Sequence, residues 1–198
     1  MKYNINVWIH EEARDFILKN IDIIDAALNF IFWQDYSLEI EEFPSEVCNT
    51  LEKNELDQVN IKDLILVFRN LNKVNVGAID IIIISRDLYH EGREYIFAAT
   101  HIPTKTIVIS LYRLMRTYSM DGFEDENIIR RRVFKELLHE LGHLLGLEHC
   151  SNSRCVMSFS PDLKSLDDKL PFFCSSCVNK LKSMGYKVFG PADDFNIL

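Results

Sequence analysis

Residues 139–149 of this chain read HELGHLLGLEH. The stretch contains His-Glu-x-x-His and extends it by a glycine and a third histidine, so it supplies three imidazoles and one carboxylate. A catalytic zinc site has three protein ligands and keeps a fourth position for water or substrate. Hydrolysis at a bound zinc ion is therefore the first function that these residues suggest.

The spacing within the stretch predicts a role for each side chain. His139 and His143 lie one turn apart on one face of a helix, so both imidazoles can reach a single zinc ion at roughly 2.0–2.1 Å. Glu140 points about 100° away from His139 and is predicted to be the general base. Gly146 ends the helix, which allows His149 to turn back as the third ligand. In this mechanism zinc lowers the pKa of its water towards about 7, and the glutamate passes the proton to the leaving amine.

A simpler interpretation is a helix that carries histidines by chance, with His149 held by ordinary hydrogen bonds. The short motif alone does not exclude it. The extended motif also requires a glycine at the helix end and a histidine in register after it, and Gly146 and His149 meet both conditions. We therefore favour the zinc site.

Four of the five cysteines cluster directly after the third histidine, at Cys150, Cys155, Cys174 and Cys177. Four thiolates are the ligand set of a closed, structural zinc site, which leaves no position for chemistry. Disulfides or free thiols are the alternative, and the absence of a visible export signal argues against disulfides. A zinc-ribbon module that binds nucleic acid is a weaker alternative, because the surrounding charge is acidic.

Composition sets limits on the class of protein. The 198 residues, 47% of them hydrophobic, are enough for one compact domain or a domain with two lobes. The net charge of −8 argues against a nucleic-acid partner. The one dense basic run, residues 130–132, would wrap around a helix and is expected to be solvated. No secretory signal and no membrane span are visible, so we expect a soluble, cytoplasmic protein. We also expect it to be a monomer.

Hydrophobic patterning predicts an α/β fold with a mixed sheet. Residues 79–85 form an almost continuous β-branched run, typical of a strand that is covered on both faces. Further strands are expected over residues 4–9, 37–43, 95–101 and 106–110. Helices are expected over residues 11–32, 56–71, 126–145 and 175–184.

Met157 stands two residues after Cys155. A lone methionine more often fills a core. Here, three histidines, a glycine turn and a following methionine resemble the metzincins and their Met-turn. The cysteines narrow the resemblance to the archaemetzincins, a metzincin family of archaea and some vertebrates. The residues that carry it run from His139 to Cys177, with weaker similarity around residues 107–113.

The resemblance implies a metzincin-like fold: a twisted sheet with two long helices in an N-terminal lobe, residues 1–146, and a small irregular C-terminal lobe, residues 147–198. It implies two zinc ions, a catalytic one on His139, His143 and His149 and a structural one on the four cysteines. By analogy Glu140 is the general base, and Met157 lies below the metal. An edge strand between residues 95 and 110 would pair with an extended peptide or protein substrate.

Two further expectations follow from the order of these residues. Because Cys150 directly follows a histidine ligand and Cys155 precedes Met157, loss of either cysteine should weaken the catalytic zinc site. In some metzincins a tyrosine follows the methionine, whereas Ser158 and Phe159 stand here, so the oxyanion must be stabilised by zinc itself or by an unidentified group.

Two functions fit these residues. The leading hypothesis is a zinc-dependent metallopeptidase, since Glu140 is present. The alternative is a zinc-binding protein on the same scaffold that is catalytically weak or silent and binds peptides. The zinc-ribbon hypothesis leaves the histidines unexplained.

Overall fold

The computed structural model describes residues 2–71 and 77–188. A five-stranded sheet has the order β2-β1-β4-β8-β7, in which β7 is antiparallel to β8 and the other neighbours are parallel. Its strands are β1 (Tyr3–Ile9), β2 (Tyr36–Glu42), β4 (Ile79–Ile84), β7 (Ala98–His101) and β8 (Thr106–Ser110). A smaller sheet consists of β3 (Val59–Asn60), β5 (Leu88–His90) and β6 (Arg93–Ile96).

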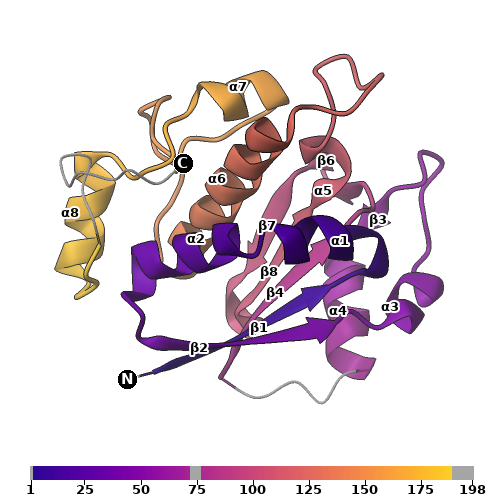
Figure 1. Cartoon of the computed structure of the whole chain (residues 1–198), viewed down its shortest axis with the longest axis horizontal. Helices are drawn as coiled ribbons and strands as arrows, with labels where there is room; N and C mark the ends of the chain where they lie inside the picture. Colours follow the sequence, from indigo (N-terminus) through magenta and orange to yellow (C-terminus); the bar gives the residue numbers. More distant parts are fainter. Residues whose placement is uncertain (1, 72–76, 189–198) are drawn as a thin grey trace.

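Helices cover both faces of the large sheet (Figure 1). Side chains of the central strand β4 alternate between two cores: Ile81 and Ile83 face one, whereas Ile82 and Ile84 face the other. The first core includes α1 (Glu11–Lys19), α2 (Asp22–Phe32) and α6 (Glu126–Leu144), and the second includes α3 (Ser45–Thr50) and α4 (Ile61–Leu71). The predicted α/β fold with a mixed sheet is confirmed.

One charged side chain interrupts the apolar strand β4. Asp80 is fully buried, and its carboxylate accepts hydrogen bonds from Asn6 Nδ2 and Trp8 Nε1, both at 2.9 Å. It also forms an ion pair with Arg69 at 3.0 Å. A buried carboxylate requires such partners, and they allow an aspartate within a central strand.

Two predicted elements are each divided in the structure. The helix expected over residues 11–32 breaks at Asn20, whose side chain donates to Glu126 Oε1 at 3.0 Å. The same amide also donates to Phe16 O at 2.9 Å, and asparagine side chains compete in this way with the helical backbone. The strand expected over residues 95–101 breaks at Phe97, so β6 joins the small sheet and β7 the large one. Both breaks involve contacts with distant segments.

The remaining strands agree with prediction to within one residue. The helix expected from residue 56 begins at Ile61, because Val59 and Asn60 pair as β3. Several short elements were not predicted: α3, β3, β5, α5 (Leu111–Leu114) and α7 (Leu163–Asp168). Each is too short to show a clear hydrophobic period.

The ends of α6 lie where the sequence predicts them. Asp125 is the N-cap, and its carboxylate accepts a hydrogen bond from Asn127 N at 2.9 Å. Gly146 follows the helix with φ of 93°, in the left-handed region that favours glycine.

The basic run on α6 is not the solvated face that was expected. Arg132 is fully buried and donates to both carboxylate oxygens of Asp167, at 2.9 and 2.7 Å. It also donates to two backbone carbonyls, so its guanidinium is well supplied with acceptors. The expectation was wrong for this residue, because Arg132 joins α6 to α7.

Residues 145–188 contain α7 and α8 (Ser175–Ser183) and otherwise little regular structure. Leu141 of α6, Met157 and Phe173 belong to the same buried cluster as the sheet. The division into residues 1–146 and 147–198 stays a prediction. Within residues 2–71 and 77–188, no helix is long and apolar enough to cross a membrane.

Candidate active site and metal centres

Three histidines converge at the end of α6. Each offers a ring nitrogen, and the three atoms lie within 4.8 Å of one another. The Nε2 atoms of His139 and His143 are 3.0 Å apart, since the residues are one helical turn apart. His149 reaches them because Gly146 redirects the chain after the helix. The structure thus brings the three predicted side chains together.

The outer ring nitrogens of two histidines contact backbone carbonyls. His139 Nδ1 lies 2.7 Å from Val156 O, and His143 Nδ1 lies 2.8 Å from Leu147 O. A carbonyl only accepts hydrogen bonds, so each Nδ1 carries the proton and each Nε2 has a free lone pair. Burial lowers the pKa of both imidazoles, which favours their neutral form. Two lone pairs that face each other at 3.0 Å repel unless a cation lies between them.

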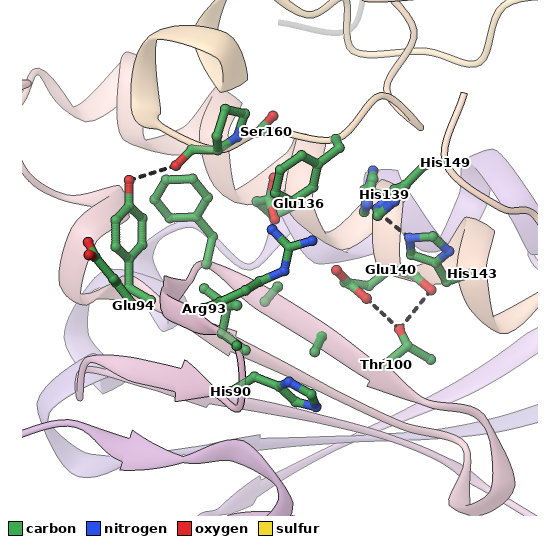
Figure 2. A pocket seen from close by; sticks show the side chains of 18 of the residues that line it. His90, Arg93, Glu94, Thr100, Glu136, His139, Glu140, His143, His149 and Ser160 are labelled. Carbon is green, nitrogen blue, oxygen red and sulfur yellow. Dashed lines mark hydrogen bonds between the residues drawn. The ribbon is translucent and has the colours of Figure 1, made fainter. Parts of the chain in front are cut away.

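Glu140 is buried beside the histidines and is held by a hydroxyl group from another element. Thr100 Oγ1, on the edge strand β7, donates to Glu140 Oε2 at 2.7 Å (Figure 2). Burial, and after it the neighbouring Glu136, raises the pKa of the Glu140 carboxyl to about 8. A cation bound by the histidines would favour the carboxylate form.

Met157 is fully buried and packs against α6 at Gly142. A Cβ atom on Gly142 would lie 2.4 Å from Met157 Sδ, so this close approach depends on a glycine. The backbone on either side of the methionine serves both candidate sites. Val156 O accepts the hydrogen bond from His139, and Met157 O accepts one from Cys150 N at 2.9 Å.

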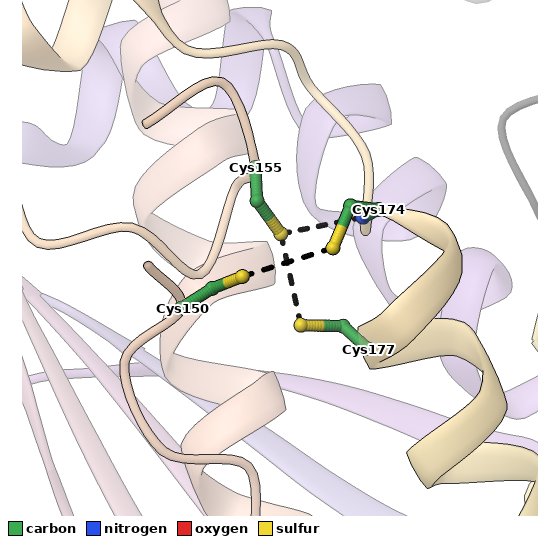
Figure 3. Close-up of side chains that lie close together, drawn as sticks. All are labelled: Cys150, Cys155, Cys174 and Cys177. Atoms are coloured by element: carbon green, nitrogen blue, oxygen red, sulfur yellow. Dashed lines mark hydrogen bonds between the residues drawn. The ribbon is translucent and has the colours of Figure 1, made fainter. Parts of the chain in front are cut away.

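The four late cysteines form a second group (Figure 3). Their sulfur atoms all lie within 4.8 Å of one another, with Cys150–Cys174 at 3.7 Å and Cys155–Cys177 at 3.8 Å. These separations are far longer than a disulfide bond of about 2.05 Å. All four are free cysteines in the structure. The cluster therefore has the shape of a metal site.

A cleft of about 580 Å³ opens in front of the histidines (Figure 2). One wall is formed by β6 and β7, the opposite wall by α6, and one end by the segment after Met157. The cleft is lined by His90, Gly92, Arg93, Glu94, Tyr95, Ile96, Phe97, Ala98, Ala99, Thr100, Ile102, Glu136, His139, Glu140, His143, His149, Phe159, Ser160, Pro161 and Lys169.

Comparison with known proteins agrees with this geometry. The model of peptidase family M54 matches residues 46–183, a range that includes both candidate metal sites. The chain belongs to peptidase family M54. The archaemetzincin of Natronomonas pharaonis is 43% identical over 113 residues, which are 56% of this chain and 65% of that protein. That of Haloarcula marismortui is 41% identical over 124 residues, 61% of this chain and 69% of that protein.

The resemblance to the archaemetzincins is thus confirmed, and the aligned part spans slightly less than two thirds of the N. pharaonis relative. Two crystal structures show the same fold as this M54 chain. Archaemetzincin from Methanopyrus kandleri superposes with a TM-score of 0.74 at 24% identity, over 92% of this chain and 95% of that one. A zinc-dependent peptidase from Methanocorpusculum labreanum superposes with a TM-score of 0.70 at 20% identity, over 89% of this chain and 99% of that one.

Two buried charged side chains of the M54 cleft were not identified from sequence. Lys169 and Glu136 are only 3% and 5% exposed. Lys169 Nζ lies 3.3 Å from Val156 O, the carbonyl that also accepts from His139. Burial lowers the pKa of Lys169, whereas Glu136 and Glu140 raise it. Glu136 precedes Glu140 by one helical turn, a spacing that could have indicated it; nothing local marks Lys169.

The tyrosines of this M54 chain do not supply an obvious oxyanion group. Tyr118 donates to Asp167 Oδ2 at 2.9 Å, and neither it nor Tyr112 lines the cleft. Tyr95 does line the cleft, but its hydroxyl donates to Pro161 O at 2.7 Å. Phe159 instead packs near the histidines, with its ring centroid 5.4 Å from that of His149.

Proposed function

We propose that this chain is a zinc-dependent metallopeptidase that hydrolyses peptide bonds in the cleft, with Glu140 as general base. The observation that carries the proposal is the convergence of three imidazoles beside a buried, hydroxyl-anchored carboxylate on the wall of an open cleft. Membership of a peptidase family supports it.

The histidines fit a zinc ion. Three nitrogen ligands at 2.0–2.1 Å in a tetrahedral arrangement would lie about 3.4 Å apart. The 3.0 Å between the Nε2 atoms of His139 and His143 is close to this value. Carbonyl acceptors at both Nδ1 atoms orient the rings and leave the inner nitrogens free for a metal, as is usual for histidine ligands.

When bound, zinc would lower the pKa of a water and polarise the scissile carbonyl. Glu140 takes a proton from the attacking water and passes it to the leaving amine. Thr100 holds one carboxylate oxygen, so the other is free to face the water. Glu140 is buried and Thr100 is half-buried, so the hydrogen bond between them is largely shielded from solvent and is strengthened.

The edge strand β7 is the proposed platform for the substrate. It is the last strand of the large sheet, so its outer backbone groups have no strand partner among the described residues. An extended peptide could pair with this edge by main-chain hydrogen bonds. Thr100, on the same strand, would then bring the paired peptide next to Glu140.

We further propose a second, structural zinc ion on the four cysteines. Thiolates at 2.3 Å around a tetrahedral zinc would lie about 3.8 Å apart. The distances of 3.7 and 3.8 Å agree with this arrangement. Backbone N–H groups of Asn152 and Cys174 point at Cys150 Sγ and Cys155 Sγ, at 3.5 and 3.3 Å, and would stabilise thiolate charge.

The backbone supports the proposed coupling between the two sites. The segment from Cys155 to Met157 lies between them: Cys155 belongs to one site, Val156 O orients His139 of the other, and Met157 O accepts from Cys150 N. A metal held by the cysteines would therefore restrain the carbonyl that positions a histidine. The cleft would lie between the N-terminal part, 1–146, and the C-terminal part, 147–198.

The proposal is tested with a peptide library, the zinc-loaded wild type and Glu140→Ala, each with its zinc content measured. We expect zinc-dependent cleavage by the wild type and a loss of at least about 100-fold in the variant, at equal zinc content. Glu39→Ala, an exposed glutamate on β2, is the control and should retain activity. Equal cleavage by wild type and Glu140→Ala would favour the silent peptide-binding alternative. Peptides with blocked N-termini distinguish endopeptidase from aminopeptidase action.

A further inference from the structure

One cation in the cleft has no carboxylate partner in the part of the chain that the structure describes. Arg93 begins β6 and lines the cleft. Among residues 2–71 and 77–188, no carboxylate lies within ion-pair distance of its guanidinium. Lys169, which also lines the cleft, differs from Arg93, because Glu136 and Glu140 raise its pKa and so favour its charged form.

The carboxylates next to Arg93 in sequence do not neutralise it. Glu91 forms an ion pair with Lys62 at 3.1 Å. Glu94 directly follows Arg93 on β6, so the two side chains point to opposite sides of the strand. Figure 2 shows Arg93 extending into the cleft toward the histidines, whereas Glu94 is turned the other way.

The guanidinium is held in place by an aromatic ring. Its central carbon lies 4.2 Å from the centroid of Phe159, and that ring lies 5.4 Å from the ring of His149. The backbone of Arg93 pairs with that of His90 in the hairpin formed by β5 and β6, and the turn of this hairpin contains Gly92 with φ of 82°. Because this contact uses the central carbon over the ring, the N–H groups of the guanidinium remain able to donate.

We propose that Arg93 is a specificity residue that binds a carboxylate of the peptide substrate near the catalytic centre; this rests on the proposed peptidase function. A planar guanidinium matches a planar carboxylate with two parallel hydrogen bonds. The carboxylate can come from the C-terminus of the peptide or from an Asp or Glu side chain. The chain has a net charge of −8, so a local cation is needed to offset the repulsion of acidic peptides.

The test compares kcat/KM for pairs of peptides that differ only in one carboxylate. One set exchanges Asp for Asn and Glu for Gln at each position; the other exchanges a free C-terminus for an amide. We expect the zinc-loaded wild type to prefer the carboxylate member of one set by about 10- to 100-fold. The set that shows the preference identifies the source of the carboxylate.

Arg93→Gln should bring the ratio of kcat/KM between the carboxylate peptide and its neutral partner to about 1. Arg93→Lys keeps the charge but loses the planar guanidinium that makes two parallel hydrogen bonds, so it should give an intermediate ratio. Arg116→Gln is the matched control, because Arg116 stacks on Phe123 at 4.3 Å outside the cleft; the wild-type ratio should persist. A wild-type ratio near 1 in both sets, or a ratio that Arg93→Gln leaves unchanged, overturns the proposal.

A binding measurement separates this proposal from the proposed function. Fluorescence anisotropy of the same labelled peptides on the zinc-loaded protein does not depend on turnover. If no peptide is cleaved, the peptidase proposal fails, and the binding data decide the role of Arg93. Tighter binding of the carboxylate member, lost in Arg93→Gln, supports it; equal binding of both members refutes it.

Discussion

Gly142→Ala isolates the contact between helix α6 and Met157. Gly142 lies inside α6, where alanine is favoured over glycine by about 1 kcal/mol. The added Cβ would, however, lie 2.4 Å from Met157 Sδ and 3.1 Å from both Met157 Cε and Phe173 Cε1. Ordinary carbon contacts lie at about 3.5–4.0 Å, so the methionine must move by more than about 1 Å.

The methionine has little room to move, because Met157 and Phe173 are both fully buried. Overpacking of this kind costs about 1–3 kcal/mol, which outweighs or cancels the gain in helix propensity. We expect Gly142→Ala to lower the free energy of unfolding by about 1 kcal/mol. Affinity for zinc at the histidines should also fall, because Val156 O, beside Met157, orients His139.

The assay is a double-mutant cycle measured by urea unfolding at fixed zinc and reductant concentrations. Met157→Ala alone should cost about 2–5 kcal/mol by leaving a cavity. In that background Gly142→Ala should be neutral or stabilising, since the atoms that it meets first are gone. A coupling energy of about 1–3 kcal/mol is expected. If Gly142→Ala destabilises both backgrounds equally, the Met157 contact is not the reason for a glycine here.

Three further predictions concern the neighbouring groups. Thr100→Val removes the hydroxyl bound to Glu140 and should lower kcat about 10-fold at unchanged zinc content, while Thr100→Ser should restore it; equal rates in all three would refute the anchor. Cys155→Ser should reduce zinc content and weaken zinc binding at the histidines, measured by competition with a chelator; unchanged affinity there contradicts the coupling. Burial lowers the pKa of Lys135 from 10.5 to about 8, so the lysine loses its proton at a lower pH in the folded state than in the unfolded state. The free energy of unfolding should therefore rise between pH 8 and pH 10.5, by up to about 3 kcal/mol relative to Lys135→Met. A parallel pH dependence of unfolding in wild type and Lys135→Met would count against that shift.

The parts of the fold that could be predicted have a strong local signal. The isoleucine run of β4 marks a central strand, and Asp125 and Gly146 mark both ends of α6. The divisions at Asn20 and Phe97 could not be predicted in the same way. Asn20 binds Glu126, more than a hundred residues away, and Phe97 stands where the chain passes from one sheet to the other.

The candidate site shows the same distinction. Histidine spacing and the glycine at the helix end predict that the three imidazoles gather, because one turn of helix and a few residues of chain determine their separation. The four cysteines are predicted to gather from their residue type and clustering, and folding brings the two distant pairs together. Arg132 shows the limit of such patterns: a run of three arginines predicts a solvated face, and only packing against Asp167 buries one of them.

Residue identity and spacing along the chain were enough to predict the family, the α/β class and the two groups of side chains that we propose as metal ligands. What surrounds these groups depends on tertiary packing. It brings Thr100 of the edge strand to Glu140, and Lys169 to the carbonyl that orients His139. It also places Arg93 in the cleft. These contacts join segments that are far apart in the chain. They form when the sheet, the helix and the C-terminal segment pack together, so a local pattern of residues does not predict them.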